Sequence, residues 1–133
     1  MTSFTTNTTE RAVTLPGADY AHWLVRAALA GIFLYHGLTK FPSLAAGSEM
    51  MGLPFWLWTL VAVVEAAAGL GLLLGGALRS RTGDLITRAS GAGVVAIMIG
   101  AIVLVHLGPW SGMEFQVLML AVGGYFLLRG NHA

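Results

Sequence analysis

The chain has 133 residues, of which 56% are hydrophobic and 10% are charged, and its formal net charge at pH 7 is +1. A soluble globular domain usually has about 25% charged residues, so this composition excludes a water-exposed globular fold and indicates a membrane protein. The chain contains no cysteine, which excludes disulfides, thiolate metal sites and dithiol redox chemistry within it.

Residues 1–20 form a threonine-rich segment without a continuous apolar run. Such a segment buries too little apolar surface to fold by itself, so we predict a flexible tail. We expect no cleavable secretory signal, because the first apolar run begins near residue 21 and is long enough to remain in the membrane.

Four apolar segments follow the tail, and charged residues separate them into residues 21–41, 55–78, 89–107 and 114–129. A helix needs roughly 20 apolar residues to cross a bilayer, so the first three segments are long enough and the fourth is short. The fourth segment spans only where the bilayer is thinned or where its outer end meets a polar depression. Because lipid offers the backbone no hydrogen-bond partners, each segment is expected to be a helix. The sequence therefore predicts an all-α fold, an integral membrane four-helix bundle over residues 21–129.

Basic residues are distributed unevenly between the two ends of these predicted helices. If the helices alternate in direction, six of the seven Lys and Arg residues lie on one side of the membrane and only Lys40 lies on the other. Loops rich in Lys and Arg usually stay in the cytoplasm. Both termini, the tail and the loop RSRTGD at residues 79–84 are therefore predicted to be cytoplasmic.

Ionisable side chains interrupt the apolar segments in the predicted outer half of the bundle. Glu65 lies near the middle of the second segment, where a charged group costs about 2.5 to 3.5 kcal/mol. His36 and Lys40 are four residues apart on the first segment and share one helix face. His106 lies at the outer end of the third segment. We predict that these groups turn away from lipid and surround a shared interior cavity.

Simpler interpretations stay open for each of these residues. Glu65 could form a structural ion pair between the first two helices, and Lys40 could extend to the lipid headgroups. His106 could be an interfacial residue without a specific task. Arg26 could be a topology anchor. Arg26, Phe33 and Lys40 nevertheless recur at seven-residue steps, which predicts that all three lie on the stripe facing the bundle interior.

Two further patterns bear on metal binding and on packing. Four side chains are of types that could hold iron, copper or zinc: His36, Glu65, His106 and Glu114. They come from four separate helices and form no short-range pair of the His-x-x-His or Glu-x-x-His type, so we expect no metal site. Small residues recur four positions apart, a spacing that lets membrane helices approach closely. We expect packing contacts at these pairs: Ala27 with Gly31, Gly71 with Gly75, Ala89 with Gly93, and Ala96 with Gly100.

The order of the motifs resembles the DoxX family of small bacterial and archaeal membrane proteins. The resemblance covers about residues 23–129 and rests on GIFLYHGLTKF, on GLPFWLWTLVAVVEAAAGLGLLLG, on LRSRTG and on a third segment ending in VLVHLG. It implies a four-helix integral membrane protein in the bacterial inner (cytoplasmic) membrane. The positions that match the family pattern are Arg26, His36, Lys40, Glu65 and His106, with Gly37 and Gly69 as helix-packing positions. The chain departs from the family at its end, which reads RGNHA.

The resemblance implies a redox role, because the family takes its name from a subunit of a thiosulfate:quinone oxidoreductase. On this hypothesis the chain holds no resident cofactor, binds a quinone or a similar apolar ligand, and receives electrons from a partner subunit. His36 and Lys40 would donate hydrogen bonds to the quinone, and Glu65 would relay protons. The catalytic candidates are Glu65 and His36, and the ligand-binding candidates are Lys40, His106, Arg26, Phe33 and Trp56. Phe33, Trp56 and also Trp58 would supply apolar walls for the ligand.

Two other functions stay open. The chain could be a non-catalytic membrane anchor or assembly subunit of a larger enzyme complex, with the polar cluster as an interhelical lock. It could also form an ion or small-molecule pathway, although four helices leave little room for a pore. In each case we expect a lipid bilayer and a protein partner or a homo-oligomer around the chain, and no nucleic acid.

Overall fold

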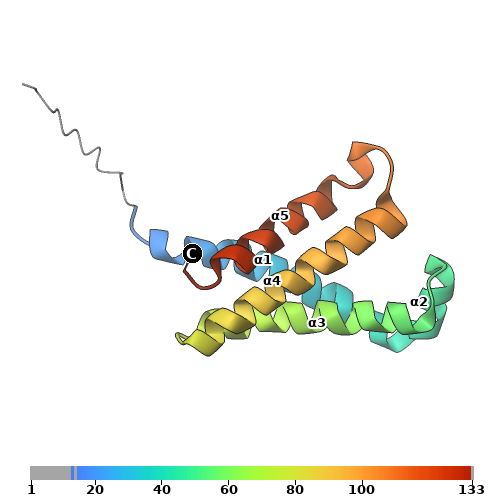
Figure 1. The fold of residues 1–133 in the computed structure, drawn as a ribbon, viewed down its shortest axis with the longest axis horizontal. Helices are drawn as coiled ribbons and strands as arrows, with labels where there is room; N and C mark the ends of the chain where they lie inside the picture. The colour runs from blue at the N-terminus through green and yellow to red at the C-terminus, as the bar shows by residue number, and fades with distance from the viewer. Residues whose placement is uncertain (1–12, 14, 133) are drawn as a thin grey trace, which may run out of the picture.

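The computed structural model describes residue 13 and residues 15–132, and this part of the chain is all-helical (Figure 1). Four long helices cover the four apolar segments of the sequence. They are α1 (Ala21–Lys40), α3 (Phe55–Ala77), α4 (Arg81–Ala101) and α5 (Glu114–Arg129). Most of the predicted flexible tail, residues 1–12 and 14, lies outside the described residues, and a 3-10 turn at Ala18–Tyr20 leads into α1.

Short elements fill the connections between the long helices. A 3-10 turn at Phe41–Ser43 follows α1, and a short helix, α2 (Leu44–Met51), occupies part of the segment between α1 and α3. Helix α2 ends at Gly52, whose φ of 65° gives the left-handed conformation that ends many helices. Helix α4 continues into a π-helical turn at Ile102–His106, and a 3-10 turn at Trp110–Gly112 precedes α5.

Helix α4 begins earlier than the apolar segment that it contains. The Ser80 hydroxyl oxygen accepts a hydrogen bond from the Gly83 backbone N–H at 3.1 Å. This contact satisfies one of the amide groups that a helix N-terminus leaves without an intrahelical partner. The polar stretch from Arg81 is consequently the first part of α4 rather than an irregular loop.

The long helices form two pairs that pack against each other mainly through α3 and α4, with a smaller contact between α1 and α5. Helix α1 packs along α3, α4 packs along α5, and α3 joins the pairs by packing against α4. We call the end with residue 21, residues 78–80 and residue 129 the terminal end, and the opposite end the distal end. Figure 1 shows α3 and α4 diverging from their connection at the terminal end, so the two pairs separate toward the distal end.

Glycines set the short distance between α1 and α3. A Cβ atom on Gly37 would lie 2.5 Å from the backbone nitrogen of Ala66, and one on Gly69 would lie 2.9 Å from the carbonyl oxygen of Ala30. Any larger residue at either position would therefore force the helices apart, as expected for packing positions.

The expected small-residue contacts are present only in part. A Cβ atom on Gly75 would meet Thr87 and Gly83 on α4. The prediction is wrong for Gly31 and Gly100 within this chain, because no atom of another element lies within 4 Å of either position. Spacing along the helix identifies small residues but does not show which face of the helix meets a neighbour.

The outer faces of the helices are apolar and exposed. Leu60, Leu70 and Leu74 on α3 and Ile99 on α4 are each about half exposed. Two helices, Phe55–Ala77 and the continuous helix Arg81–His106, are long and apolar enough to cross a membrane by length and composition. Exposed apolar surface of this extent would be unfavourable in water, whereas hydrocarbon leaves it without cost.

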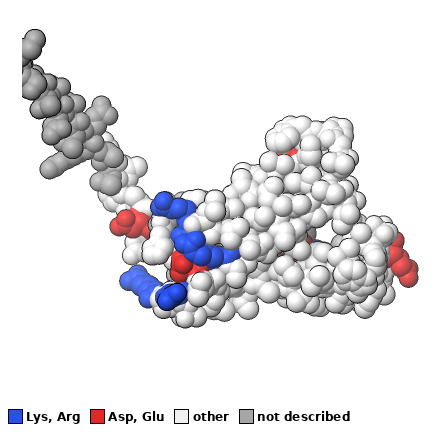
Figure 2. All heavy atoms as spheres, in the orientation of Figure 1, with Lys and Arg blue, Asp and Glu red and all other residues white. Residues whose placement is uncertain are grey.

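Charged side chains gather at the terminal end. Figure 2 shows Lys and Arg over the terminal ends of the helices, and a largely white surface over the rest of this face. The described arginines, all of which belong to the terminal half, are Arg26, Arg79, Arg81, Arg88 and Arg129. Lys40 is the one Lys or Arg residue of the distal half, so the bundle is electrostatically asymmetric along its length.

Candidate functional site

An ion pair joins α1 to α3 in the distal half of the bundle. The Lys40 ammonium nitrogen lies 2.5 Å from Glu65 Oε2, and the two side chains are 12% and 9% exposed. Lys40 also donates a hydrogen bond to the His36 carbonyl oxygen at 3.0 Å, and its nitrogen lies 5.1 Å from the centre of the Trp58 ring. Glu65 thus faces the interior of the bundle, and Lys40 turns toward Glu65 rather than toward the headgroup region.

The sequence positions these two groups through ordinary helix geometry. Lys40 is the last residue of α1, where a cation interacts favourably with the helix dipole. Gly37 lies one turn before Lys40 and lets α1 approach the backbone of α3 at Ala62 and Ala66. Glu65 lies between those two alanines in the sequence, so the close contact at Gly37 brings the carboxylate within reach of Lys40.

A second polar pair, in the same half of the bundle, joins the π-helical turn after α4 to α5. His106 Nδ1 lies 3.0 Å from the carbonyl oxygen of Ala101, and His106 Nε2 lies 3.2 Å from the side-chain nitrogen of Gln116. A carbonyl oxygen only accepts, so Nδ1 bears the hydrogen and Nε2 of the neutral ring accepts from the Gln116 amide. The π-helical turn at Ile102–His106 orients this histidine, and such turns are frequent at functional sites.

The two polar pairs line one cavity of about 480 Å³, which we call the distal cavity. Its walls come from α1, α3, α4 and α5 and are mainly apolar. Among the lining residues that matter here are Phe33, His36, Trp58, Val64, Met98 and Met119. Figure 2 shows a hollow in the surface between the distal parts of the two helix pairs.

Two polar atoms in the wall of the distal cavity have no hydrogen-bond partner among the described residues. They are the Trp58 ring nitrogen, which is a donor, and the Gln116 side-chain oxygen, which is an acceptor. Buried polar groups are normally paired, and each unpaired one costs about 1 to 3 kcal/mol. Both atoms are fully buried, and the Trp58 nitrogen is packed against Gly47 of α2, where an added Cβ atom would lie 2.5 Å from it. A bound molecule reaches either atom only if the side chain that bears it turns.

The sequence-based candidates divide into those that line the distal cavity and those that do not. Glu65, His36, Lys40, His106 and Phe33 all line it. Trp56 does not: its side chain is 66% exposed, and Trp58, two residues further along α3, lines the cavity instead. The structure also does not bring Arg26 to this cavity.

Arg26 lies in the terminal half and is fully buried. One guanidinium nitrogen donates to the Leu72 carbonyl oxygen at 2.6 Å and to the Thr87 hydroxyl at 3.1 Å. The other terminal nitrogen donates to the Asn131 side-chain oxygen at 3.1 Å. The guanidinium also lies 4.6 Å from the centre of the Phe126 ring. Arg26 therefore joins α1 to α3, α4, α5 and the segment after α5.

Asn131 was not among the sequence-based candidates, yet it connects this terminal network. Its side-chain nitrogen donates to the Gly75 carbonyl oxygen at 2.7 Å, and its backbone N–H donates to Asp84 Oδ1 at 2.8 Å. The Thr87 hydroxyl donates to its side-chain oxygen at 2.7 Å. The sequence held one indication of this contact: a glycine, Gly130, directly before Asn131, which permits a turn. In the structure Gly130 has a φ of 62°, and the chain turns back there after α5.

The described part of the chain contains no group of three or more His, Asp or Glu side chains placed to hold a metal ion. The arrangement instead provides an apolar cavity with an ion pair on one side and a histidine–amide pair on the other. Such a site can hold an apolar ring by contact and its polar substituents by hydrogen bonds.

Apolar outer faces, four long helices and buried ion pairing define a small helical membrane protein. The model of the DoxX family matches residues 21–107, which are more than half of the chain and cover α1 to the π-helical turn. The chain therefore belongs to the DoxX family of membrane proteins. No curated protein and no solved structure matches the chain.

Proposed function

We propose that the chain is the quinone-binding membrane subunit of a redox system, and that the distal cavity is its ligand site. The observation that supports this proposal is the position of the two polar pairs in one apolar cavity. A quinone has an apolar ring with carbonyl oxygens at opposite positions, so it can meet one polar pair with each carbonyl. The cavity volume of about 480 Å³ lies within the range of small-molecule sites.

Each polar group has a distinct task in this proposal. The Lys40 ammonium donates a hydrogen bond to a quinone oxygen, and the Trp58 ring packs against the quinone ring. The Gln116 side-chain oxygen, which is unpaired and buried in the free protein, turns toward the quinol and accepts a hydrogen bond from its hydroxyl group. One site can thus bind the oxidised ligand through a donor and the reduced ligand through an additional acceptor.

Glu65 and His36 handle protons. Reduction of a quinone to a quinol takes up two electrons and two protons. A carboxyl group and an imidazole beside the ring can deliver these protons one at a time, and Lys40 contacts the carboxylate that is left after a transfer. The electrons come from a partner protein, so the chain is not active alone.

The proposed setting is the inner membrane of a bacterium, crossed by all four long helices with both termini in the cytoplasm. The excess of arginine at the terminal end supports this orientation. The distal cavity then lies in the half of the bilayer that faces the periplasm.

Tryptophan fluorescence tests ligand binding, because a bound quinone quenches an adjacent indole. The protein in lipid nanodiscs is titrated with a short-tailed ubiquinone analogue. We expect saturable quenching that Trp58→Phe removes and Trp56→Phe retains, since only Trp58 lines the distal cavity. Quenching that is equal in both variants, or that never saturates, would show only partition of the analogue into lipid.

A second experiment tests proton transfer separately from binding. Glu65→Gln keeps a hydrogen-bonding side chain of the same shape but cannot exchange a proton. We expect this variant to insert, to bind the analogue, and to lose quinone-linked electron transfer in membranes that contain the native partner. Unchanged turnover would remove Glu65 from the mechanism.

A membrane anchor or assembly subunit is the second candidate function. The observation that favours it is the direct ion pair between Lys40 and Glu65, which already satisfies both groups and locks α1 to α3. On this account Glu65→Gln has little effect, the analogue does not bind, and an extramembrane protein co-purifies with the chain.

A further inference from the structure

Arg26 is a fully buried guanidinium with no carboxylate partner among the described residues. Its hydrogen bonds go to a backbone carbonyl, a hydroxyl and an amide oxygen, and its Nε has no partner. Charges removed from water are normally paired, because an uncompensated buried charge is strongly unfavourable. The network therefore binds the guanidinium without neutralising it.

A second cavity, of about 780 Å³, lies directly beside this charge at the terminal end. Trp23, Gly76 and Asn131 line this terminal cavity, and each is also next to Arg26. The Trp23 ring centre is 5.5 Å from the guanidinium carbon, and a Cβ atom on Gly76 would lie 2.8 Å from Nε. Arg26 consequently lies behind one wall of the cavity.

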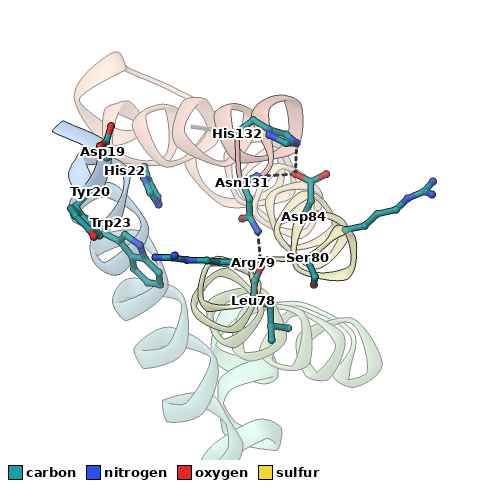
Figure 3. Close-up of a pocket in the computed structure, with 12 residues that line it drawn as sticks. Asp19, Tyr20, His22, Trp23, Leu78, Arg79, Ser80, Asp84, Asn131 and His132 are labelled. Carbon is teal, nitrogen blue, oxygen red and sulfur yellow. Dashed lines mark hydrogen bonds and ion pairs between the residues drawn. The ribbon is translucent and has the colours of Figure 1, made fainter. Parts of the chain in front are cut away.

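The rim of the terminal cavity adds positive charge. Arg79 and Arg81, at the connection between α3 and α4, line the cavity, and neither forms an ion pair within the described part of the chain. Figure 3 shows the Arg79 side chain extending across the cavity toward Trp23, with His22 facing the same space.

The carboxylates in the cavity do not balance these arginines. Asp84 forms an ion pair with Arg88 at 2.8 Å and accepts the Asn131 N–H, so its charge is already compensated. Asp19 is the other carboxylate in the lining. The cavity thus has two arginines in its lining and the buried charge of Arg26 behind its wall, against one uncompensated carboxylate.

We propose that the terminal cavity binds a phosphate anion, which supplies the missing counter-charge to Arg26, Arg79 and Arg81. Arg79 and Arg81 suit this task because a planar guanidinium donates in pairs to phosphate oxygens, whereas Arg26 acts through its charge from behind the wall. The anion is either the phosphodiester of an anionic lipid headgroup or free inorganic phosphate. Leu78, which lines the cavity and is 45% exposed, leads from it to the apolar outer face of α3, where lipid chains would lie.

Thermal unfolding of the purified protein in detergent tests the proposal in three arms. Phosphatidylglycerol, phosphatidylcholine and inorganic phosphate are added separately. We expect phosphatidylglycerol to raise the melting temperature more than phosphatidylcholine does. Stabilisation by phosphatidylglycerol alone identifies a lipid headgroup, and equal stabilisation by inorganic phosphate identifies the free anion. Equal stabilisation by both lipids, or by none of the three additives, overturns the proposal.

Three Arg→Gln variants, each of which removes one positive charge, test whether phosphatidylglycerol binds at the terminal cavity. Arg79→Gln and Arg81→Gln are each expected to weaken phosphatidylglycerol binding about fivefold. This factor corresponds to about 1 kcal/mol of attraction between one basic residue and an anionic lipid. Arg129→Gln removes an arginine from the same end of the bundle but outside the cavity lining, and it should leave binding unchanged. An equal loss in all three variants would indicate general surface charge and would overturn the proposal.

Asn131→Asp tests the role of Arg26 without removing it. A carboxylate at the position of the Asn131 side-chain oxygen, 3.1 Å from the guanidinium, would supply the counter-charge from within the chain. The stabilisation by phosphatidylglycerol should then shrink. A variant that folds and responds to the lipid as the native chain does would show that Arg26 needs no external anion.

Discussion

Removing either partner of the Lys40–Glu65 ion pair should destabilise the bundle, but by different amounts. Removal of one partner of a well-buried pair typically costs about 3 to 5 kcal/mol, because the other charge stays buried. In Lys40→Met the remaining charge is Glu65, which lies within α3 and cannot reach the headgroups. We therefore expect a loss of about 3 kcal/mol or more.

Glu65→Leu should cost less, about 1 to 2 kcal/mol, in the range of single interhelical hydrogen bonds in membranes. Lys40 is the last residue of α1, so its ammonium can extend to the headgroups once Glu65 is gone. The double variant should lie close to the native chain, since well-packed apolar side chains often replace a buried pair at little cost.

Reversible unfolding in mixed detergent micelles, followed by circular dichroism, measures these differences as a double-mutant cycle. The native chain, both single variants and the double variant are compared under the same conditions. If the cost of the double variant equals the sum of the two single costs, then Lys40 and Glu65 do not interact and the assignment of the pair is wrong.

Three further predictions follow from other contacts. Gly37→Ala should lower unfolding stability by about 1 to 3 kcal/mol through overpacking against Ala66, whereas Gly31→Ala, which meets no neighbour, should be neutral or slightly stabilising; equal effects in an unfolding titration would show that Gly37 is not a packing position. Asn131→Ala should cost about 1 to 3 kcal/mol in the same titration, because it leaves buried donors and acceptors without partners; a variant as stable as the native chain would contradict the terminal network. Gln116→Leu should weaken binding of the reduced quinone analogue more than the oxidised one in the quenching assay, because only the quinol has a hydroxyl for the Gln116 oxygen; equal weakening would remove that acceptor role.

The inward position of Glu65 could be predicted from the sequence because few arrangements satisfy a carboxylate in the middle of an apolar helix. Lys40 was the nearest cation in depth, and the seven-residue spacing from Phe33 placed it on the interior stripe. Ionisable side chains are unfavourable in contact with lipid chains, so those in the distal half were expected to gather in the interior. This expectation does not depend on how the helices pack.

The choice between Trp56 and Trp58 was beyond such reasoning. Residues two positions apart project from an α-helix in roughly opposite directions, and both sides of α3 are apolar in sequence. Only the contacts of α3 with its neighbours decide which indole lines the cavity and which is 66% exposed.

The contact between Arg26 and Asn131 was also inaccessible to sequence reasoning. The two residues are separated by 105 positions, and Asn131 lies after the last helix, where hydrophobic periodicity gives no information. A single polar residue in such a position has many possible partners. The turn at Gly130 places Asn131 against Arg26 of α1 and Asp84 of α4, and this is visible only in the folded structure.

A crystal structure of the protein with the quinone analogue, from crystals grown in a lipid mesophase, would test most directly the claim that the distal cavity binds a quinone. The account predicts the analogue between the Lys40–Glu65 pair and the His106–Gln116 pair, with Trp58 against its ring. Glu65 directed at lipid chains, or an analogue bound outside the distal cavity, would contradict the account.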